Sequence, residues 1–589
     1  PMSAEWPWTQ TCKAMDRLRA LRSGDLRYLR KLETGLEMEF AVAGARFRIV
    51  LELDAAENDL VFRLQPLVSG EADLIAADLP GPLLPGESRQ VQVLVDYRNQ
   101  GRLFTGASGA METETPAVRK LAMLEGRYRL RFFGVLGDRR AVGSAKAGYN
   151  AIIEENADAQ IILRQEEDGR LSPSVGWLPS MGTLGYARVI RYRFEDRPTV
   201  VTLAKSFRRY AMGAGLFKSL RDKIAEQPQI RNLVGATACF IGYQKSRLDY
   251  VNTFRRLRKM GHKRFYIFPT FHINLGFTDM AGDPPIDIRR HSKALQALGG
   301  MLGSWTYLAG LPNRVEKQRL AVRNADGTFP LNWQIDDDVW RQTCMRMACA
   351  ELAGRHEDLL QADIHHFDTT AGNALQECYA PTHLQDRRMD REYRIRLFRE
   401  VTGLNRLPVS ESVKDWAVPH YLMGSNKEVP VLGESPAFRV VPLQHLVYHD
   451  AIFSLWWEVD CYDVPYFHGG NLAAQSITDI LYGDMPLIFP VGRQYRWVKG
   501  GKSWQAANFE QSLAMPACAA AAKRAVDVAR HFGKVALEEM TDFRWLSADG
   551  CVQQTGFSNG GSVIANFGKE PGSAPGGKAV APMDARVMQ

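Results

Sequence analysis

Apolar and polar positions alternate along residues 34–200. In the stretch GLEMEFAVAGARFRIVLELD, every second residue of two short runs is apolar. These positions are Leu36, Met38, Phe40 and Val42 in the first run, and Phe47, Ile49, Leu51 and Leu53 in the second. Turn-forming segments such as AAEND and LPGPLLPGES interrupt such runs. Period-two runs broken by turns predict an antiparallel β-sandwich over residues 1–200.

The rhythm changes after residue 200. The spacing over residues 201–229 is helical, which predicts a connector between two domains. Over residues 230–510, short apolar runs alternate with helix-like segments. The runs are LVGATACFIG, RFYIFPTFHINLGF, WTYLAGL, DLLQADIHHFD and LPVSES, followed later by FRVVPLQHLVYHD and LWWEVDCYDVPYFHGG. Strands that alternate with helices over this length predict a (β/α)8-type barrel.

Two of the helix-like segments in this region show a defined apolar face. In DDDVWRQTCMRMACAELAGRH the face contains Trp340, Cys344, Met347, Ala348 and Leu352. In DRRMDREYRIRLFREVTG it contains Met389, Tyr393, Leu397 and Val401. Each segment is expected to form one continuous helix covering the barrel.

Beyond the barrel, the pattern predicts a small C-terminal β domain. Residues 511–568 contain a helix with Pro516 near its start and Gly533 at its end, followed by β-strands. Residues 569–589 are rich in Gly, Pro and Ala, which predicts a flexible tail.

Composition narrows the classes of function. Hydrophobic residues make up 45% of the 589 residues, and the formal net charge is +8. The basic residues are mixed with acids, without a basic arm or a nucleic-acid motif, so a nucleic-acid partner is not expected. No apolar stretch reaches the roughly 18 residues of a membrane span, so no membrane partner is expected. The oligomeric state is not predicted.

Cysteine usage and the N-terminus bear on the compartment. The eight cysteines are scattered and form no CxxC pair, which is typical of free thiols in a reducing compartment. The N-terminal PMSAEWPWTQ lacks the pattern of a signal peptide. A cytoplasmic location is therefore predicted, with a secreted or periplasmic location as the alternative if a leader has been removed.

Polar residues close several of the predicted barrel strands. Strand ends at the carboxyl side of a barrel carry the active site, and Asp368 and Glu411 close the fourth and fifth runs. Neighbouring strands lie about 4.8 Å apart, so these carboxylates can reach the roughly 5 Å separation of a retaining glycosidase. One would attack the anomeric carbon, and the other would protonate the leaving oxygen and then activate water.

Other strand-end and aromatic side chains are candidates for binding a sugar. Polar groups at these ends can hydrogen-bond to hydroxyls, and aromatic rings can stack on sugar faces. The candidate substrate-binding residues are His272, Trp333, His366, Trp416, Asp450 and Asp463.

Two other functions remain open at this stage. His272, His365, His366 and Asp368 could bind a divalent ion in a metal-dependent hydrolase. Successive strand residues point to opposite faces, however, so at most one of the two adjacent histidines faces such a site. A non-catalytic carbohydrate-binding protein is the third interpretation.

The same alternation predicts the orientation of the stretch that contains Asp368. His366 and Asp368 are expected to point into the pocket, while Phe367 packs outward under the helices. His365 is then a structural histidine.

Four segments together resemble a known family. DIHHFDTTAG, LPVSESVKDWAVP, VVPLQHLVYHD and DILYGDMPLIF resemble glycoside hydrolase family 129 and its relative, family 101. The resemblance covers residues from about 200 to 568. It implies a β-sandwich, a distorted (β/α) barrel and C-terminal β modules, and α-N-acetylgalactosaminidase activity on mucin-type O-glycans.

The resemblance also implies roles for individual residues. Asp368 would be the nucleophile and Glu411 the acid/base of a retaining mechanism. No cofactor is implied; some relatives bind calcium, but no calcium ligand set can be assigned in this sequence. Where relatives often carry a His-Asp-Asn-Tyr type stretch, this chain has SWTYLAGLPN, so an α-linked galactose stays an alternative to N-acetylgalactosamine.

Overall fold

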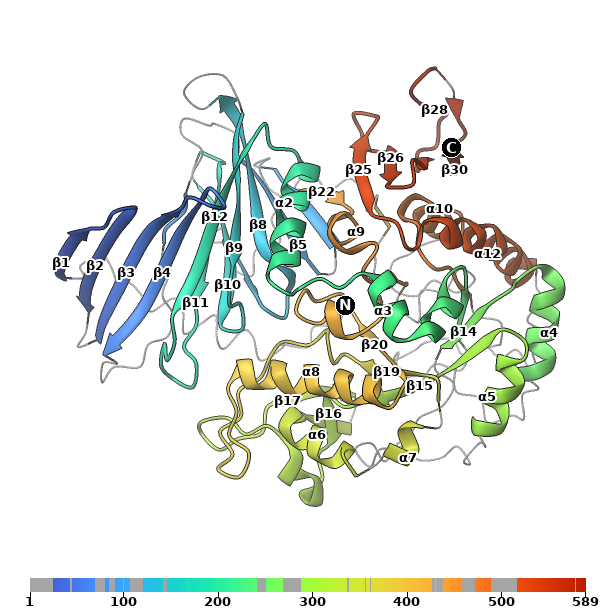
Figure 1. The fold of residues 1–589 in the computed structure, drawn as a ribbon, viewed down its shortest axis with the longest axis horizontal. Helices are drawn as coiled ribbons and strands as arrows, with labels where there is room; N and C mark the ends of the chain where they lie inside the picture. Colours follow the sequence, from blue (N-terminus) through green and yellow to red (C-terminus); the bar gives the residue numbers. More distant parts are fainter. Residues whose placement is uncertain are drawn as a thin grey trace.

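The computed structural model consists of a large antiparallel sheet, a curled parallel sheet with helices around it, and a small C-terminal β unit (Figure 1). It describes residues 25–588 with internal gaps. The gaps are 43–44, 69–79, 84–90, 99, 106–119, 141–145, 167, 241–249, 269–287, 336–337, 355, 361, 426–428, 431–437, 457–471, 489–515 and 578.

The N-terminal region forms a ten-stranded sheet in the order β1-β2-β3-β4-β12-β9-β8-β5-β6-β22. All of its pairings are antiparallel. The strands are β1 Asp25–Lys31, β2 Gly35–Val42, β3 Ala45–Asp54, β4 Asp59–Val68, β5 Val91–Tyr97, β6 Gln100–Phe104, β8 Tyr128–Arg140, β9 Lys146–Ile153, β12 Arg188–Asp196 and β22 Phe438–Val441.

A second, three-stranded sheet shares a core with the first. It contains β7 (Lys120–Leu124), β10 (Ala159–Gln165) and β11 (Leu171–Trp177), in the order β11-β10-β7. Apolar residues of both sheets form one buried cluster, which includes Val93 from the large sheet and Ile161 from the small one. Two sheets around one core confirm the predicted sandwich architecture.

One strand was predicted in the wrong domain. The run FRVVPLQHLVYHD lies among the predicted barrel strands in sequence, but its strand β22 pairs with β6 at the edge of the N-terminal sheet. Local periodicity identifies a strand without specifying its partner, because pairing is decided by tertiary contacts.

Two helices form the predicted connector. Helix α2 (Val200–Gly213) starts at a capping box made by Thr199 and Thr202, and α3 (Leu220–Glu226) is capped by Ser219. Helix α2 packs against α9 (Leu443–Tyr448), so the connector lies between the two large regions.

The second region is built on an eight-stranded sheet in the order β23-β21-β20-β19-β15-β14-β13-β24, and all its pairings are parallel. The strands are β13 Thr237–Phe240, β14 Phe265–Phe268, β15 Gly300–Tyr307, β19 Ile364–Asp368, β20 Leu407–Glu411, β21 Met423–Ser425, β23 Phe453–Ser454 and β24 Leu487–Ile488. Strand β24, the last of them in sequence, pairs with β13, the first in sequence. A pairing between β23 and β24, which would close a barrel, is not present among the described residues.

Helices cover this parallel sheet, as its buried strands require. They are α4 Tyr250–Met260, α5 Ile288–Gln296, α6 Met345–Leu352, α7 His356–Leu359, α8 Arg387–Gly403, α10 Leu472–Tyr482 and α12 Pro516–Val535, with the short 3-10 helices η1 Pro228–Leu233, η2 Val315–Leu320 and η3 Val418–His420. The helix predicted from DRRMDREYRIRLFREVTG is α8. Its buried face includes Leu397 and Val401 as predicted, but Met389 is exposed.

The other predicted helix was only half right. The first part of DDDVWRQTCMRMACAELAGRH forms strand β18 (Asp338–Gln342), which pairs with β16 (Gly310–Pro312) and β17 (Leu331–Ile335). Trp340 stacks on Trp333 of β17 at a centroid distance of 4.6 Å. This cross-strand aromatic pair stabilises a hairpin where the helical spacing suggested a continuous helix.

The C-terminal unit contains one correction. Strands β25 (Met540–Trp545), β26 (Val552–Phe557) and β27 (Ser562–Asn566) follow α12 as predicted. The tail predicted as flexible forms the short pair β28 (Gly572–Ser573) and β29 (Ala579–Val580), and then β30 (Asp584–Met588), which pairs with β27. Composition misled here because pairing with β27 and the burial of Val580 offset the entropy cost of ordering the tail.

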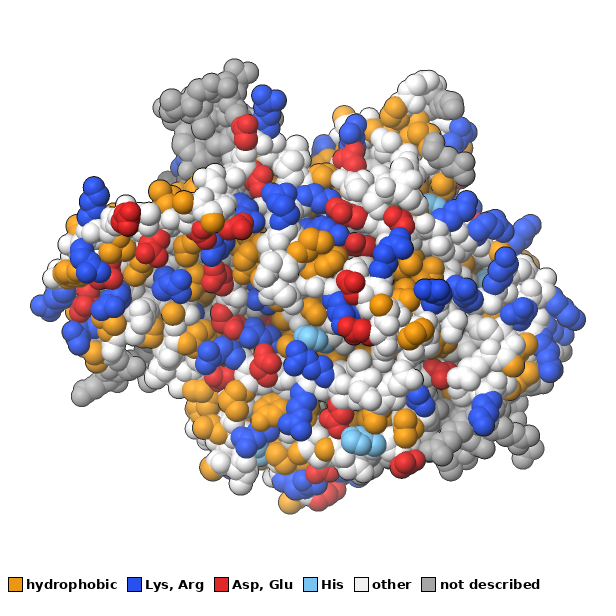
Figure 2. Space-filling model, viewed as in Figure 1, with side chains coloured by type: hydrophobic (Ala, Val, Ile, Leu, Met, Phe, Trp, Pro, Cys, Tyr) orange, Lys and Arg blue, Asp and Glu red, His pale blue; other side chains and the backbone are white. Residues whose placement is uncertain are grey.

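None of the helices in the described part of the chain is long and apolar enough to cross a membrane. Over the N-terminal sheet, acidic and basic side chains are interspersed on the face shown in Figure 2.

Candidate functional site

The two predicted catalytic carboxylates close two adjacent parallel strands. Strands β19 and β20 are in register from Ile364 opposite Leu407 to Phe367 opposite Ser410. Asp368 and Glu411 are the next residues of the two strands, and both are 9% exposed. Equivalent positions on neighbouring strands bring two carboxylates to one edge of the sheet.

The residue after each carboxylate has an unusual backbone conformation. Thr369 has φ 56° and Ser412 has φ 63°, in the left-handed region that non-glycine residues rarely adopt. Such residues cost about 1–3 kcal/mol each and persist where the surrounding structure holds them. Both strands therefore turn sharply just after the carboxylate.

Hydrogen bonds fix the turn after β19. Ser410 Oγ donates to the carbonyl of Phe367 at 2.6 Å and accepts from the amide of Ala371 at 3.0 Å. Arg394 of α8 donates to the carbonyl of Thr370 at 2.9 Å. One hydroxyl thus ties the end of β20 to the loop that follows Asp368.

The outward face of β19 is structural, as predicted. His365 Nδ1 lies 2.7 Å from Ser304 Oγ, and its Nε2 lies 2.6 Å from the carbonyl oxygen of Leu359. Phe367 lies beside Phe398 of α8, with ring centroids 6.2 Å apart. Both predictions, a structural His365 and an outward Phe367, are confirmed.

The inward face of β19 carries His366 and Asp368, by the alternation of the strand. His366 is 1% exposed, and burial lowers its pKa to about 3. Its imidazole is therefore neutral at pH 7, so it can accept or donate a hydrogen bond without adding charge. Whether it contacts substrate stays a prediction.

Strand β15 supplies an aromatic wall next to β19. Trp305 is paired in register with His366, and Tyr307 with Asp368. The rings of Trp305 and Tyr307 stack at 6.1 Å, and every residue of β15 except Trp305 is buried. Trp333, a predicted sugar contact, stacks on Trp340, whose ring lies edge-on to Tyr307.

The pKa of the Tyr307 hydroxyl is affected by both carboxylates. Burial raises the pKa of its hydroxyl, and the negative charges of Asp368 and Glu411 raise it further. The hydroxyl accepts a hydrogen bond from Asn332 Nδ2 and stays protonated at neutral pH. Tyr307 therefore offers a neutral O–H at the same strand edge as the two acids.

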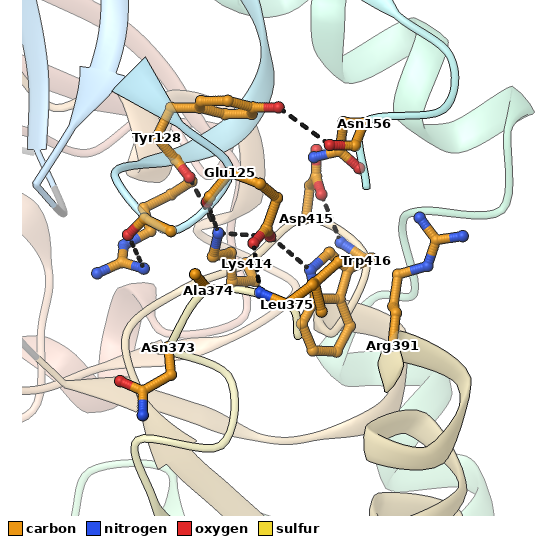
Figure 3. A network of polar contacts seen from close by, with 12 residues as sticks. Glu125, Tyr128, Asn156, Asn373, Ala374, Leu375, Arg391, Lys414, Asp415 and Trp416 are labelled. Atoms are coloured by element: carbon orange, nitrogen blue, oxygen red, sulfur yellow. Dashed lines mark hydrogen bonds and ion pairs between the residues drawn. The ribbon is translucent and has the colours of Figure 1, made fainter. Parts of the chain in front are cut away.

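The N-terminal sheet reaches this edge through the turn between β7 and β8. Lys414 Nζ donates to Glu125 Oε1 at 2.6 Å, and Glu125 Oε1 also accepts from the indole N–H of Trp416 at 3.3 Å (Figure 3). The opposite oxygen of Glu125 accepts from the amide of Leu375 in the loop after β19. The turn between β7 and β8 can lie this close to the loop after β19 only because residue 126 is glycine. A Cβ on Gly126 would lie 2.6 Å from Ala374 Cβ.

A second buried ion pair lies beside the first. Asp415 accepts from the Arg131 Nε at 2.9 Å and from its backbone amide at 2.8 Å. We refer to Glu125, Arg131, Lys414 and Asp415 as the interdomain cluster. The side chains of both pairs are at most 6% exposed.

Arg129 links this cluster to the strand-end acids. Its Nη1 donates to the carbonyl of Gly372 at 2.6 Å. Burial lowers the pKa of its guanidinium, and the negative charge of Glu411 is among those that oppose this shift. A Cβ on Gly372 would lie 3.7 Å from Glu411 Cβ, so this loop runs next to the acid.

Two other predicted sugar-binding residues have structural contacts. Trp416 is 2% exposed, so its ring has no open face for a sugar. Asp450 accepts two hydrogen bonds from Arg208 of α2, at 2.7 and 2.8 Å. The remaining two, His272 and Asp463, lie outside the described residues.

The contacts of His365 bear on the metal-dependent alternative. Both of its ring nitrogens are engaged by protein atoms, so it is not available as a ligand next to Asp368. Within the described ranges, one cluster of three potential metal ligands occurs, and it lies elsewhere: Cys344, Cys378 and His383.

Sequence reasoning missed Tyr307 and Arg129. Tyr307 had a signal, because it closes the third apolar run just as Asp368 closes the fourth. Arg129 had none, since 243 positions separate it from the carbonyl it binds.

Comparisons with known proteins identify the fold. No protein-family model matches the chain, and no curated protein sequence matches it. The ligand-free structure of the α-N-acetylgalactosaminidase NagBb from Bifidobacterium bifidum is similar with a TM-score of 0.72 and 21% identity, covering 93% of this chain and 91% of that one. A complex of NagBb with GalNAc is equally similar, covering 93% and 90%.

A more distant likeness extends to another group of enzymes. The GH36 α-galactosidase AgaA from Geobacillus stearothermophilus matches with a TM-score of 0.52 and 11% identity, covering 92% of this chain and 78% of that one. These neighbours are the kinds of enzyme that the sequence resemblance predicts. At such identities the likeness establishes the fold.

Proposed function

We propose that the chain is a glycoside hydrolase that cleaves an α-linked galactose-type sugar, N-acetylgalactosamine or galactose, with retention of configuration. The observation that carries the proposal is the pair Asp368 and Glu411, buried at equivalent ends of two adjacent parallel strands. The fold supports it, because both neighbours named above are α-glycosidases. We also infer that the curled sheet belongs to a (β/α)8-type barrel.

In the proposed mechanism Asp368 attacks the anomeric carbon and forms a glycosyl-enzyme. Glu411 protonates the leaving oxygen, and then removes a proton from the water that releases the sugar. The neutral hydroxyl of Tyr307 is suited to hydrogen-bond to Asp368, and the ring of Trp305 to contact the sugar. The proposed order of events requires Glu411 to start protonated.

The choice between the two sugars is tested with p-nitrophenyl glycosides. We expect hydrolysis of the α-N-acetylgalactosaminide, the α-galactoside or both, and none of the β-anomers. Proton NMR of the first product should show the α-anomer; an initial β-anomer would show inversion and refute the covalent route. Absence of hydrolysis across the panel, with sugar binding retained, would favour a carbohydrate-binding protein instead.

The roles of the two acids are tested by chemical rescue. p-Nitrophenolate leaves without protonation, so Glu411→Ala should form the glycosyl-enzyme in a burst and then turn over slowly. Azide should restore turnover and give the α-glycosyl azide. With Asp368→Ala, azide should instead replace the nucleophile and give the β-glycosyl azide. Exchange of these two products would reverse the assignment.

A further inference from the structure

We propose that Cys344, Cys378 and His383 bind a zinc ion that fastens the connection between β19 and α8. One ligand atom from each of these buried residues lies within 4.8 Å of the other two. The site is separate from the strand-end acids, and the inference does not depend on the proposed glycosidase activity.

The three residues come from two segments that must be held together. Cys344 is the N-cap residue of α6. Cys378 forms an antiparallel bridge with Gln385, and His383 lies in the turn between them. This turn, residues 378–385, leads from the loop after Asp368 to Asp386, the N-cap of α8. An ion here would join α6 to the segment that follows the strand-end site.

The geometry fits a tetrahedral ion after small adjustments. Cys378 Sγ lies 3.2 Å from His383 Nδ1. Zinc bonds of about 2.3 Å to sulfur and about 2.0 Å to nitrogen place such ligand atoms roughly 3.5 Å apart. Zinc also prefers thiolate and imidazole over the oxygen ligands that suit calcium and magnesium.

The surroundings favour a thiolate. The backbone amide of Arg323 donates to Cys378 Sγ at 3.4 Å.

The amide oxygen of Gln385 would supply the fourth ligand. Gln385 is fully buried, and its Oε1 lies 3.3 Å from Cys344 Sγ. Its Nε2 donates to Asp390 Oδ1 at 3.0 Å, which directs the amide oxygen toward the sulfur atoms. Two thiolates, one imidazole and this amide oxygen would complete a closed site of the structural type.

The first test measures metal in the wild-type full-length chain. Protein from zinc-supplemented medium, dialysed extensively, should contain about one zinc per chain by inductively coupled plasma mass spectrometry. Exchange for cobalt should give thiolate-to-cobalt charge-transfer absorption in the near ultraviolet. Zinc should also protect Cys344 and Cys378 from alkylation until it is chelated. Absence of both zinc and the cobalt band, or a Cys344–Cys378 disulfide in the purified protein, would overturn the proposal.

The second test uses variants of two proposed ligands and one control variant at a nearby cysteine. Cys378→Ser and His383→Gln should lower bound zinc below about a tenth of the wild-type content. Cys349→Ala is the control, because Cys349 is a buried thiol of the same helix α6 whose Sγ donates to the Tyr393 carbonyl. It should keep its zinc. Full zinc content in Cys378→Ser would refute the ligand assignment. If a variant fails to fold, the cobalt and alkylation results on the wild-type protein decide whether the site binds metal.

Discussion

Two groups of buried charges lie within four residues of each other on one segment. Glu411 ends β20, and Lys414 and Asp415 belong to the interdomain cluster. In the cluster, each acid has a basic partner within 3 Å. At the strand ends, two acids lie with a neutral tyrosine and a neutral histidine. Ser412, with φ 63°, is the turn between the two environments.

The difference indicates which buried charges hold the fold and which are available for chemistry. Matched pairs such as Arg131–Asp415 compensate each other's desolvation, so they join domains without leaving reactivity. The strand ends instead bring two acids to one edge of the sheet, beside a neutral tyrosine and a neutral histidine, and two adjacent carboxylates are what the proposed mechanism requires. Mutations at the strand-end acids should therefore lower activity, whereas mutations in the interdomain cluster should lower stability.

The largest expected effect is on catalysis. Asp368→Asn should lower kcat/KM at least about 10³-fold, because the amide cannot form the glycosyl-enzyme. The midpoint of thermal unfolding should stay close to wild type. Activity within tenfold of wild type in a folded Asp368→Asn protein would contradict the view that the strand-end acids serve catalysis.

The next effect is on stability. Asp415→Ala should lower the free energy of unfolding by about 3–5 kcal/mol, because Arg131 is left buried without its partner. Urea denaturation measures this. The double variant with Arg131→Met should recover part of the loss, and a loss below about 1 kcal/mol would mean that the pair does not hold the interface.

A smaller effect separates Asp450 from the sugar site. Asp450→Asn should lower the free energy of unfolding by about 1.5–3 kcal/mol through its charged hydrogen bonds with Arg208. KM for the best glycoside should not change. A rise in KM with unchanged stability would instead restore the substrate-binding role predicted from the sequence.

The smallest effect concerns pH. Burial lowers the pKa of His365 to about 4 and that of His366 to about 3, from 6.5. Between pH 6.5 and about 4 the unfolded chain binds protons that the folded chain does not, so stability falls as pH falls. Each histidine contributes up to about 1.4 kcal/mol per pH unit.

Urea denaturation at pH 7 and pH 5 measures this slope. His365→Asn should reduce it, whereas the interdomain cluster should contribute little in this window because the pKa of Glu125 is lowered. An unchanged slope would mean that His365 is already protonated in the folded protein.

Much of the fold could be predicted from local patterns, and so could the positions of the two acids. Strands β19 and β20 are short and buried and each ends in a carboxylate, and a single rule about strand ends selects Asp368 and Glu411. The orientation of His365 and Phe367 follows from alternation alone.

The failures share a physical cause. Strand β22 in the N-terminal sheet and β30 in a supposed loose tail each depend on a partner strand outside the local pattern. Strand β18, inside a supposed helix, depends on its hairpin partner β17 and on β16. The same holds for Glu125 and Arg129, which reach the site across some 240–290 positions of sequence. The pattern of a single sequence shows the local preference of each segment for helix or strand. These features depend instead on tertiary contacts with other parts of the chain.

The contacts of Glu125, Arg129 and Arg131 have a consequence for how this chain can be divided or recombined. The loop after Asp368 is shaped from both sides, by Arg394 of its own domain and by Arg129 of the N-terminal sheet. The sheet is thus a shared scaffold rather than an appended module. The parallel-sheet region, cut out at the connector or grafted onto a foreign β-sheet, would inherit Lys414 and Asp415 as unmatched charges and an unsupported loop beside Asp368.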